Sequence, residues 1–116
     1  LDFCLVDPEE MVPTKELENQ YKVWTCFPYE DSQFVEIYRI DVEPGGTYVS
    51  GSHGENTREY LTVISGVLTV ECHGHIQQIK QEQVYKFETD QVHIYRNEGN
   101  EVASCMCFFL DYTRRK

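Results

Sequence analysis

Basic residues are scarce in this chain, and their scarcity limits the partners that it can hold. Lysine and arginine number 10 against 20 aspartates and glutamates, which gives a formal net charge of −10 over 116 residues. A surface that grips nucleic acid needs clustered Lys and Arg side chains to displace counterions. We therefore expect no direct binding of nucleic acid by this chain, and we interpret its acidity as a contribution to solubility.

Long apolar runs and paired cysteine motifs are also missing. No stretch approaches the roughly 18 apolar residues that span a bilayer, and no secretory signal pattern is visible. The five cysteines are irregularly spaced and include no CxxC pair, which argues against a zinc ribbon. We expect a cytoplasmic protein with free thiols and no membrane partner. A redox pair formed by Cys105 and Cys107 on one strand face is the alternative.

The length fits one domain, and the composition supports a packed core. Apolar residues make up 41% of the chain and aromatic residues 13%, which excludes a disordered chain. Residues 1–20 are polar and aperiodic, and we interpret them as a lead-in segment that carries no more than a short edge strand. Residues 21–116 form the folded domain. Because the chain begins with Leu rather than Met, we interpret it as a fragment of a longer protein.

Short alternating segments separated by turn signals follow residue 20, and no long helical period appears. The expected strands, in chain order, cover residues 21–27, 33–42, 59–65, 67–72 and 76–81, two short segments within 82–101, and 102–112. Closely spaced turns with almost no helix favour a sandwich or barrel. The sequence therefore predicts an all-β, antiparallel fold.

Glu59 is the first candidate site residue, because it alternates with apolar residues. Side chains two apart on a strand share a face, so Glu59 points with Leu61 and Val63 toward the predicted core. A buried carboxylate is costly unless it is paired, hydrogen-bonded or bound to a cation. Glu59 is therefore predicted to have a polar partner inside the domain.

Histidines supply the remaining candidates. His93 and Tyr95 share one strand face, and His53 precedes the Glu59 strand. Two imidazoles and one carboxylate suit Zn, Fe, Mn or Ni with open positions, whereas each histidine alone also fits an ordinary core or rim residue. His73 and His75 flank the glycine of a predicted hairpin tip, where we expect them to be solvent-exposed.

The spacings resemble two known motifs. Glu59 precedes Gly66 by seven positions and His93 precedes Asn97 by four, which is similar to the two cupin motifs. The segments FPYED, VEPGG, TREYLTVISGVLTV and HIYRN look like the C-terminal cupin domain of XRE-type bacterial regulators, and the resemblance covers residues 21–112. It implies a cupin-type double-stranded β-helix, the jelly-roll barrel. It also implies a preceding helix-turn-helix domain, missing from this chain, through which alone the protein would bind DNA.

The sequence departs from the family pattern at several motif positions. With His53 as the second histidine of the first motif, Gly51 stands at the first; in a flanking register Glu55 replaces the second. The glycines and proline of the second motif are replaced by Glu82, Glu88 and Asp90. The resemblance thus leaves a ligand pocket of His53, Glu59, His93 and Tyr95, of which the first three are the metal-ligand candidates. It leaves open whether the pocket holds a divalent metal or is a polar site without one.

The interpretation that follows is a small-molecule-sensing and dimerising cupin domain of a bacterial transcriptional regulator, rather than an enzyme. The strand FVEIYRI, residues 34–40, is expected to pair two copies into a homodimer, because both its faces are rich in apolar residues. The alternative is a stand-alone metal-dependent cupin enzyme, an oxygenase or isomerase, using His53, Glu59 and His93. A purely structural dimer module is the third interpretation.

Overall fold

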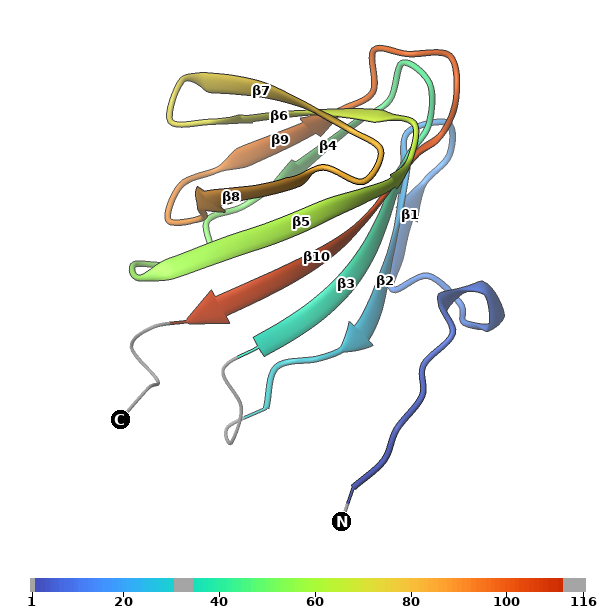
Figure 1. Ribbon diagram of the computed structural model, residues 1–116, viewed down its shortest axis with the longest axis vertical. Helices are drawn as coiled ribbons and strands as arrows, with labels where there is room; N and C mark the ends of the chain where they lie inside the picture. Colours follow the sequence, from blue (N-terminus) through green and yellow to red (C-terminus); the bar gives the residue numbers. More distant parts are fainter. Residues whose placement is uncertain (1, 31–34, 112–116) are drawn as a thin grey trace.

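The computed structural model describes residues 2–30 and 35–111, and strands dominate it (Figure 1). A short 3-10 helix, Pro8–Glu10, lies near the beginning of the chain. The strands of the described residues follow in the order β1 Lys15–Leu17, β2 Tyr21–Phe27, β3 Val35–Val42, β4 Thr47–Ser50, β5 Thr57–Ser65, β6 Val67–Cys72, β7 His75–Lys80, β8 Val84–Glu88, β9 His93–Arg96 and β10 Ala103–Asp111. The chain is therefore all-β, as its sequence predicts.

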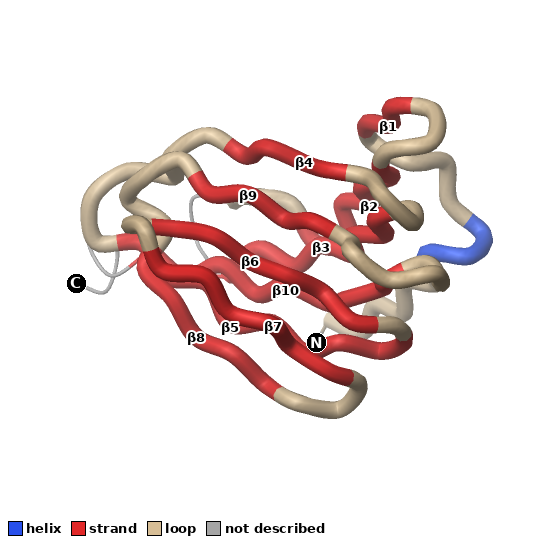
Figure 2. The backbone as a smooth tube through the Cα atoms, turned by 90° about the horizontal axis from the view of Figure 1, so that it is seen from above, coloured by secondary structure: helices blue, strands red, loops and turns tan. Residues whose placement is uncertain are grey.

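The strands form two sheets that face each other (Figure 2). One sheet has the order β1-β2-β3-β10-β5-β8 and the other has the order β4-β9-β6-β7. The ladders between these strands are antiparallel. From β3 onward the chain passes from one sheet to the other at almost every connection, and only the β6–β7 hairpin stays within a sheet. This winding places sequence-distant strands side by side.

The core lies between the sheets and follows the alternation of each strand. In β5, Thr57, Glu59, Leu61 and Val63 are buried while the residues between them are not. In β10, Cys105, Cys107 and Phe109 are buried in the same way. Side chains of period two thus line one shared interior. The alternation that places Leu61 inside also places Glu59 inside.

Two strands lie outside the expected set. β1 lies in the lead-in segment, so the sheet begins before residue 21. It corresponds to the short edge strand that the sequence leaves room for in this segment. β4 was not expected, because TYVS is too short to show an alternation; its pairing with β9 creates the strand. By contrast, β2 and β6 have the bounds that the sequence predicts. Residues 33 and 34, expected to start the β3 strand, and residues 112–116 lie outside the described residues.

Gly66 and Asn97, which end the two motif spacings, have structural roles. Gly66 joins β5 to β6 at φ +74°, and a Cβ there would lie 2.5 Å from the Val102 carbonyl oxygen, so only glycine fits this crossing. The Asn97 side chain donates to the carbonyls of Val42 and Glu101 at 2.9 and 2.6 Å. Asn97 therefore ties β9 to the loops at one end of the sheets.

No helix within residues 2–30 and 35–111 has the length and apolar character needed to cross a membrane.

Candidate ligand pocket

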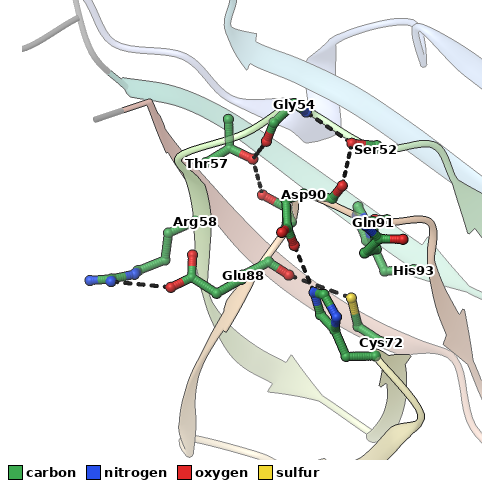
Figure 3. A network of polar contacts seen from close by, with 11 residues as sticks. Ser52, Gly54, Thr57, Arg58, Cys72, Glu88, Asp90, Gln91 and His93 are labelled. Carbon is green, nitrogen blue, oxygen red and sulfur yellow. Dashed lines mark hydrogen bonds and ion pairs between the residues drawn. The ribbon is translucent and has the colours of Figure 1, made fainter. Parts of the chain in front are cut away.

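The loop that carries His53 is fastened to the segment before β9. The His53 backbone N–H donates to the Thr89 carbonyl at 2.8 Å, and the Ser52 hydroxyl donates to the Asp90 carbonyl at 2.7 Å (Figure 3). The Thr89 hydroxyl donates to the Thr57 hydroxyl at 2.9 Å inside the domain. These bonds hold the start of β5 beside the start of β9, which brings His53 next to His93.

Glu59, His93 and Tyr95 meet in the interior, and each is 0% exposed. The Tyr95 hydroxyl donates to Glu59 Oε1 at 2.5 Å. His93 Nε2 lies 3.9 Å from the same oxygen, which is longer than a hydrogen bond. Neither Glu59 Oε2 nor His93 Nε2 has a partner of hydrogen-bond geometry among the described residues. Two polar atoms are thus buried side by side without partners.

Burial controls the charge of this cluster. Removal from water raises the pKa of Glu59 to about 8, and contacts with Tyr95 and the Cys107 thiol offset only part of that rise. Burial also lowers the pKa of His93, while its hydrogen bond to the Gln91 carbonyl acts in the opposite direction. Because His93 Nδ1 lies 3.0 Å from that carbonyl oxygen, the proton belongs on Nδ1 and Nε2 carries a lone pair. A protonated Glu59 beside a neutral His93 leaves the interior uncharged near pH 7.

His53 lies at the rim rather than in the interior. The residue as a whole is exposed, but its ring packs inward, with its centroid 4.3 Å from that of Phe109 and 5.4 Å from that of His93. Partial burial, the neighbouring His93 and the ammonium of Lys15 lower its pKa. Glu55, the alternative ligand of the flanking register, is exposed in the turn before β5.

A cavity of about 200 Å³ opens between the sheets above this cluster. Its aromatic and apolar walls are Val23, Tyr38, Ile40, Tyr48, Tyr95 and Phe109, and its polar lining is Thr14, Lys15, Thr25, Ser50 and His53. Tyr95 and His53 belong to this wall, whereas Glu59 and His93 lie behind it. The predicted residues thus divide into two that face the cavity and two that support its floor.

The residues present do not assemble a metal centre with three ligands. Glu59 and His93 offer two donor atoms of suitable chemistry, but Glu59 Oε1 already accepts from Tyr95. The ring of the third predicted ligand, His53, packs at a tilt against the Phe109 ring, and Gly51 has no side-chain donor to add. Across the described ranges, no group of three or more His, Cys, Asp or Glu side chains is placed to share one ion. We derive no chemistry from a metal here.

The substituted positions of the second motif have found other contacts. Glu88 pairs with Arg58 at 3.3 Å (Figure 3), and Asp90 Oδ1 lies within hydrogen-bond distance of His73 Nε2, at 2.6 Å. Glu82 takes a φ of +70°, the conformation for which a glycine is usual. His73 at the hairpin tip and His75, the first residue of β7, are both exposed, as the sequence predicts. Cys105 and Cys107 are free thiols with their sulfurs 3.6 Å apart.

Of the eleven residues that line the cavity, sequence reasoning named only His53 and Tyr95 and missed the others. Lys15 comes from the lead-in segment, Tyr48 from the unexpected β4, and Phe109 from the last strand. Of these, Phe109 carried a usable signal, because the alternation Cys105, Cys107, Phe109 places it on the inner face. Tyr48 reaches the cavity through pairing with β9, a strand distant in sequence. Lys15 pairs with β2, the next strand, but its three-residue strand is too short to show an alternation.

Residues 38–109, more than half of the chain, match the cupin domain family. The chain belongs to the cupin family. This cupin domain is 29% identical, over 81 residues, to the HTH-type transcriptional regulator SutR of Escherichia coli; the match covers 70% of this chain and 46% of SutR. The chain therefore spans about half the length of this curated relative. Among solved structures, the cupin domain of an XRE family transcriptional regulator from Enterobacter cloacae is 24% identical, with a TM-score of 0.72 over 78% of this chain and 95% of that one.

A second solved relative is an HTH_3 family transcriptional regulator from Vibrio cholerae. It is 25% identical with a TM-score of 0.71, and the match covers 78% of this chain and 51% of that one. These comparisons confirm the jelly-roll barrel predicted for this cupin domain, and they relate it to XRE-type regulators. Residues 2–30 and 35–111 of this cupin domain thus combine the family barrel with a cavity whose lining includes His53 but not Glu59 or His93.

Proposed function

We propose that this cupin domain is the small-molecule-sensing and dimerising part of a bacterial transcriptional regulator that acts in the cytoplasm. The observation that carries the proposal is the cavity between the sheets, whose walls include Tyr48, His53 and Tyr95. Ligand sites are concave, mostly apolar and lined by a few polar groups, and this cavity has that character. The relation to SutR supports the regulatory context, since this chain is similar to 46% of that transcriptional regulator.

In this proposal, DNA is bound by a helix-turn-helix domain attached before residue 1. The acidic cupin domain would contribute binding of the effector and pairing of two copies. A ligand can shift such a regulator only if it binds one arrangement of the protein more tightly than another. The expected behaviour is a change in DNA affinity when the cavity is filled.

The outer face of the larger sheet supports the dimerising part. Ile37, Phe108 and Tyr60 stand opposite one another on β3, β10 and β5, on the face turned away from the core. Both edges of β3 are occupied by β2 and β10, so pairing of two copies would use this face rather than a strand edge. Light scattering should give a dimer for the wild-type chain and a monomer for Phe108→Glu; a wild-type monomer at high micromolar concentration would contradict this part.

The proposal is tested by a fragment screen on the isotope-labelled chain. We expect fragments that bind to shift the amide signals of Tyr48, His53 and Tyr95, and to change DNA retention by the longer protein that carries the upstream domain. A screen in which no fragment shifts these signals would contradict ligand sensing. Ligand binding without any effect on DNA retention would contradict the regulatory part alone.

The second candidate is a metal-dependent cupin enzyme, an oxygenase or isomerase. The two unpartnered donor atoms, Glu59 Oε2 and His93 Nε2, favour it. It requires a tightly held ion, so elemental analysis of protein purified without added metal separates the two candidates. One ion per chain would favour the enzyme, and metal far below that ratio would favour the sensor.

A further inference from the structure

We propose that the cavity of this cupin domain takes a small organic monoanion, with a ring-sized apolar body between the sheets and one carboxylate held at the mouth by Lys15 and Thr25. This inference rests on the proposed ligand-binding function and names its ligand class. It uses residues of the lead-in segment and of β2, none of which belongs to the two cupin motifs.

The size of the cavity sets the size of the body. An apolar cavity of roughly 150 Å³ is large enough to hold benzene, and this one measures about 200 Å³. Val23, Ile40, Tyr48 and Phe109 give it apolar and aromatic walls. A single ring, or an aliphatic body of similar volume, with one small polar group fills such a space.

Lys15 sets the charge at the mouth. Its side chain extends from β1 on one sheet toward β4 on the other, and its ammonium nitrogen lies 5.6 Å from the centre of the Tyr48 ring. Among the described residues Lys15 makes no ion pair, and the cavity lining contains no aspartate or glutamate. A carboxylate placed there would gain a charge-assisted hydrogen bond.

Thr25 supplies a second donor beside Lys15. The Thr14 hydroxyl donates to the Thr25 hydroxyl oxygen at 2.7 Å and accepts from the Thr25 backbone N–H at 2.9 Å. Because the Thr25 hydroxyl oxygen already accepts, its own proton is left to donate. Both threonines line the cavity. Lysine and threonine donors on one side of the mouth suit the two oxygens of a carboxylate.

The same arrangement disfavours cations and zwitterions. An ammonium group in the cavity would meet Lys15 and no lining carboxylate, and burying an unpaired charge is costly. The net charge of −10 repels anions from the molecule as a whole. The positive charge of Lys15 therefore attracts anions to the mouth of the cavity, although the molecule as a whole repels them.

Three compounds that share a phenyl ring and are similar in size test the inference: benzoate, an anion; benzyl alcohol, which is neutral; and benzylamine, a cation. Their dissociation constants are measured by amide-shift titration of the whole chain, following Tyr48 and Phe109. We expect benzoate to bind about tenfold more tightly than benzyl alcohol, because only benzoate gains the charge-assisted bond, and benzylamine to bind most weakly.

Lys15→Met should remove the tenfold preference and leave the affinity for benzyl alcohol unchanged, while Lys15→Arg should keep the preference. Lys86→Met, on exposed β8 in the same sheet, is the matched control and should behave like the wild type. An unchanged amide spectrum away from the mouth will show that each variant is folded.

Two outcomes would count against the inference in different ways. A neutral or cationic fragment that fills the cavity as tightly as benzoate, or a preference that survives Lys15→Met, would overturn the anion assignment and leave ligand sensing standing. Absence of shifts at the cavity with every fragment, charged or neutral, would overturn both.

Discussion

The hydroxyl of Tyr95 donates to Glu59 Oε1 at 2.5 Å, and both side chains are wholly buried. This contact joins β9 of the smaller sheet to β5 of the larger one, across the centre of the barrel. It is also the only hydrogen bond that the Glu59 carboxyl makes with good geometry among the described residues.

Tyr95→Phe should therefore destabilise the domain by about 1–3 kcal/mol, the cost of leaving a buried polar group unsatisfied. Urea unfolding, monitored by tryptophan fluorescence, measures the change. Tyr85→Phe is the matched control, because its ring packs on the core and its hydroxyl makes no hydrogen bond to a described residue. A Tyr95→Phe protein no less stable than the control would contradict the role assigned to this bond.

The raised pKa of Glu59 predicts how stability depends on pH. Between its ordinary pKa of 4.5 and its folded pKa of about 8, the folded chain keeps a proton that the unfolded chain loses. Its contribution to stability is thus complete below pH 4.5 and is lost as the pH rises toward 8. Glu59→Gln cannot titrate, so its stability relative to the wild type should increase across this window, by at most about 1.4 kcal/mol per pH unit.

Chemical unfolding of both proteins from pH 4 to pH 9 provides the comparison. His53 and His93, whose pKa values burial lowers, are present in both proteins, and subtraction removes their contribution. A difference that stays flat from pH 4.5 to 8 would show that Glu59 is ionised in the folded domain.

Much of the fold followed from the sequence because alternation is a local property. The inward direction of Glu59 was visible from Leu61 and Val63, and the bounds of β2 and β6 followed from their composition. Tyr48 was not visible because it joins the pocket through pairing with β9, far along the chain. Lys15 was not visible because it lies on a three-residue, exposed strand that is too short to show an alternation, although its partner β2 is the next strand. Motif spacing found His93 and Glu59, but it could not show that Tyr95 already occupies one Glu59 oxygen.

Glu82→Gly should stabilise the domain by roughly 1 kcal/mol. Glu82 sits at φ +70° in the turn between β7 and β8, where a side chain costs about 1–2 kcal/mol. Glycine removes this strain, but it loses more conformational entropy on folding, which offsets part of the gain. Thermal unfolding measures the effect. Gln81→Gly, at the neighbouring position with ordinary φ, should destabilise, and a loss of stability in both variants would refute the strain at Glu82.

Gly51→His should strengthen metal binding. It restores a histidine at the first ligand position of the motif, where open space surrounds the glycine, and a further imidazole near His53 should raise zinc affinity about tenfold or more. Competition with a coloured chelator measures both affinities. Gly51→Phe is similar in size but has no donor atom, so equal zinc affinity in the two variants would rule out a latent metal site.

The position of β1 has a dynamic consequence. It pairs with β2 through three residues on one side only, and all three are exposed, so its amides should exchange with solvent at a lower opening free energy than those of β5 or β10. Lys15 belongs to this strand. The apparent affinity for an anion held by Lys15 is then the intrinsic affinity multiplied by the fraction of molecules in which β1 is paired with β2. Displacement of the preceding segment, residues 2–14, would change that fraction without altering any residue of the cavity.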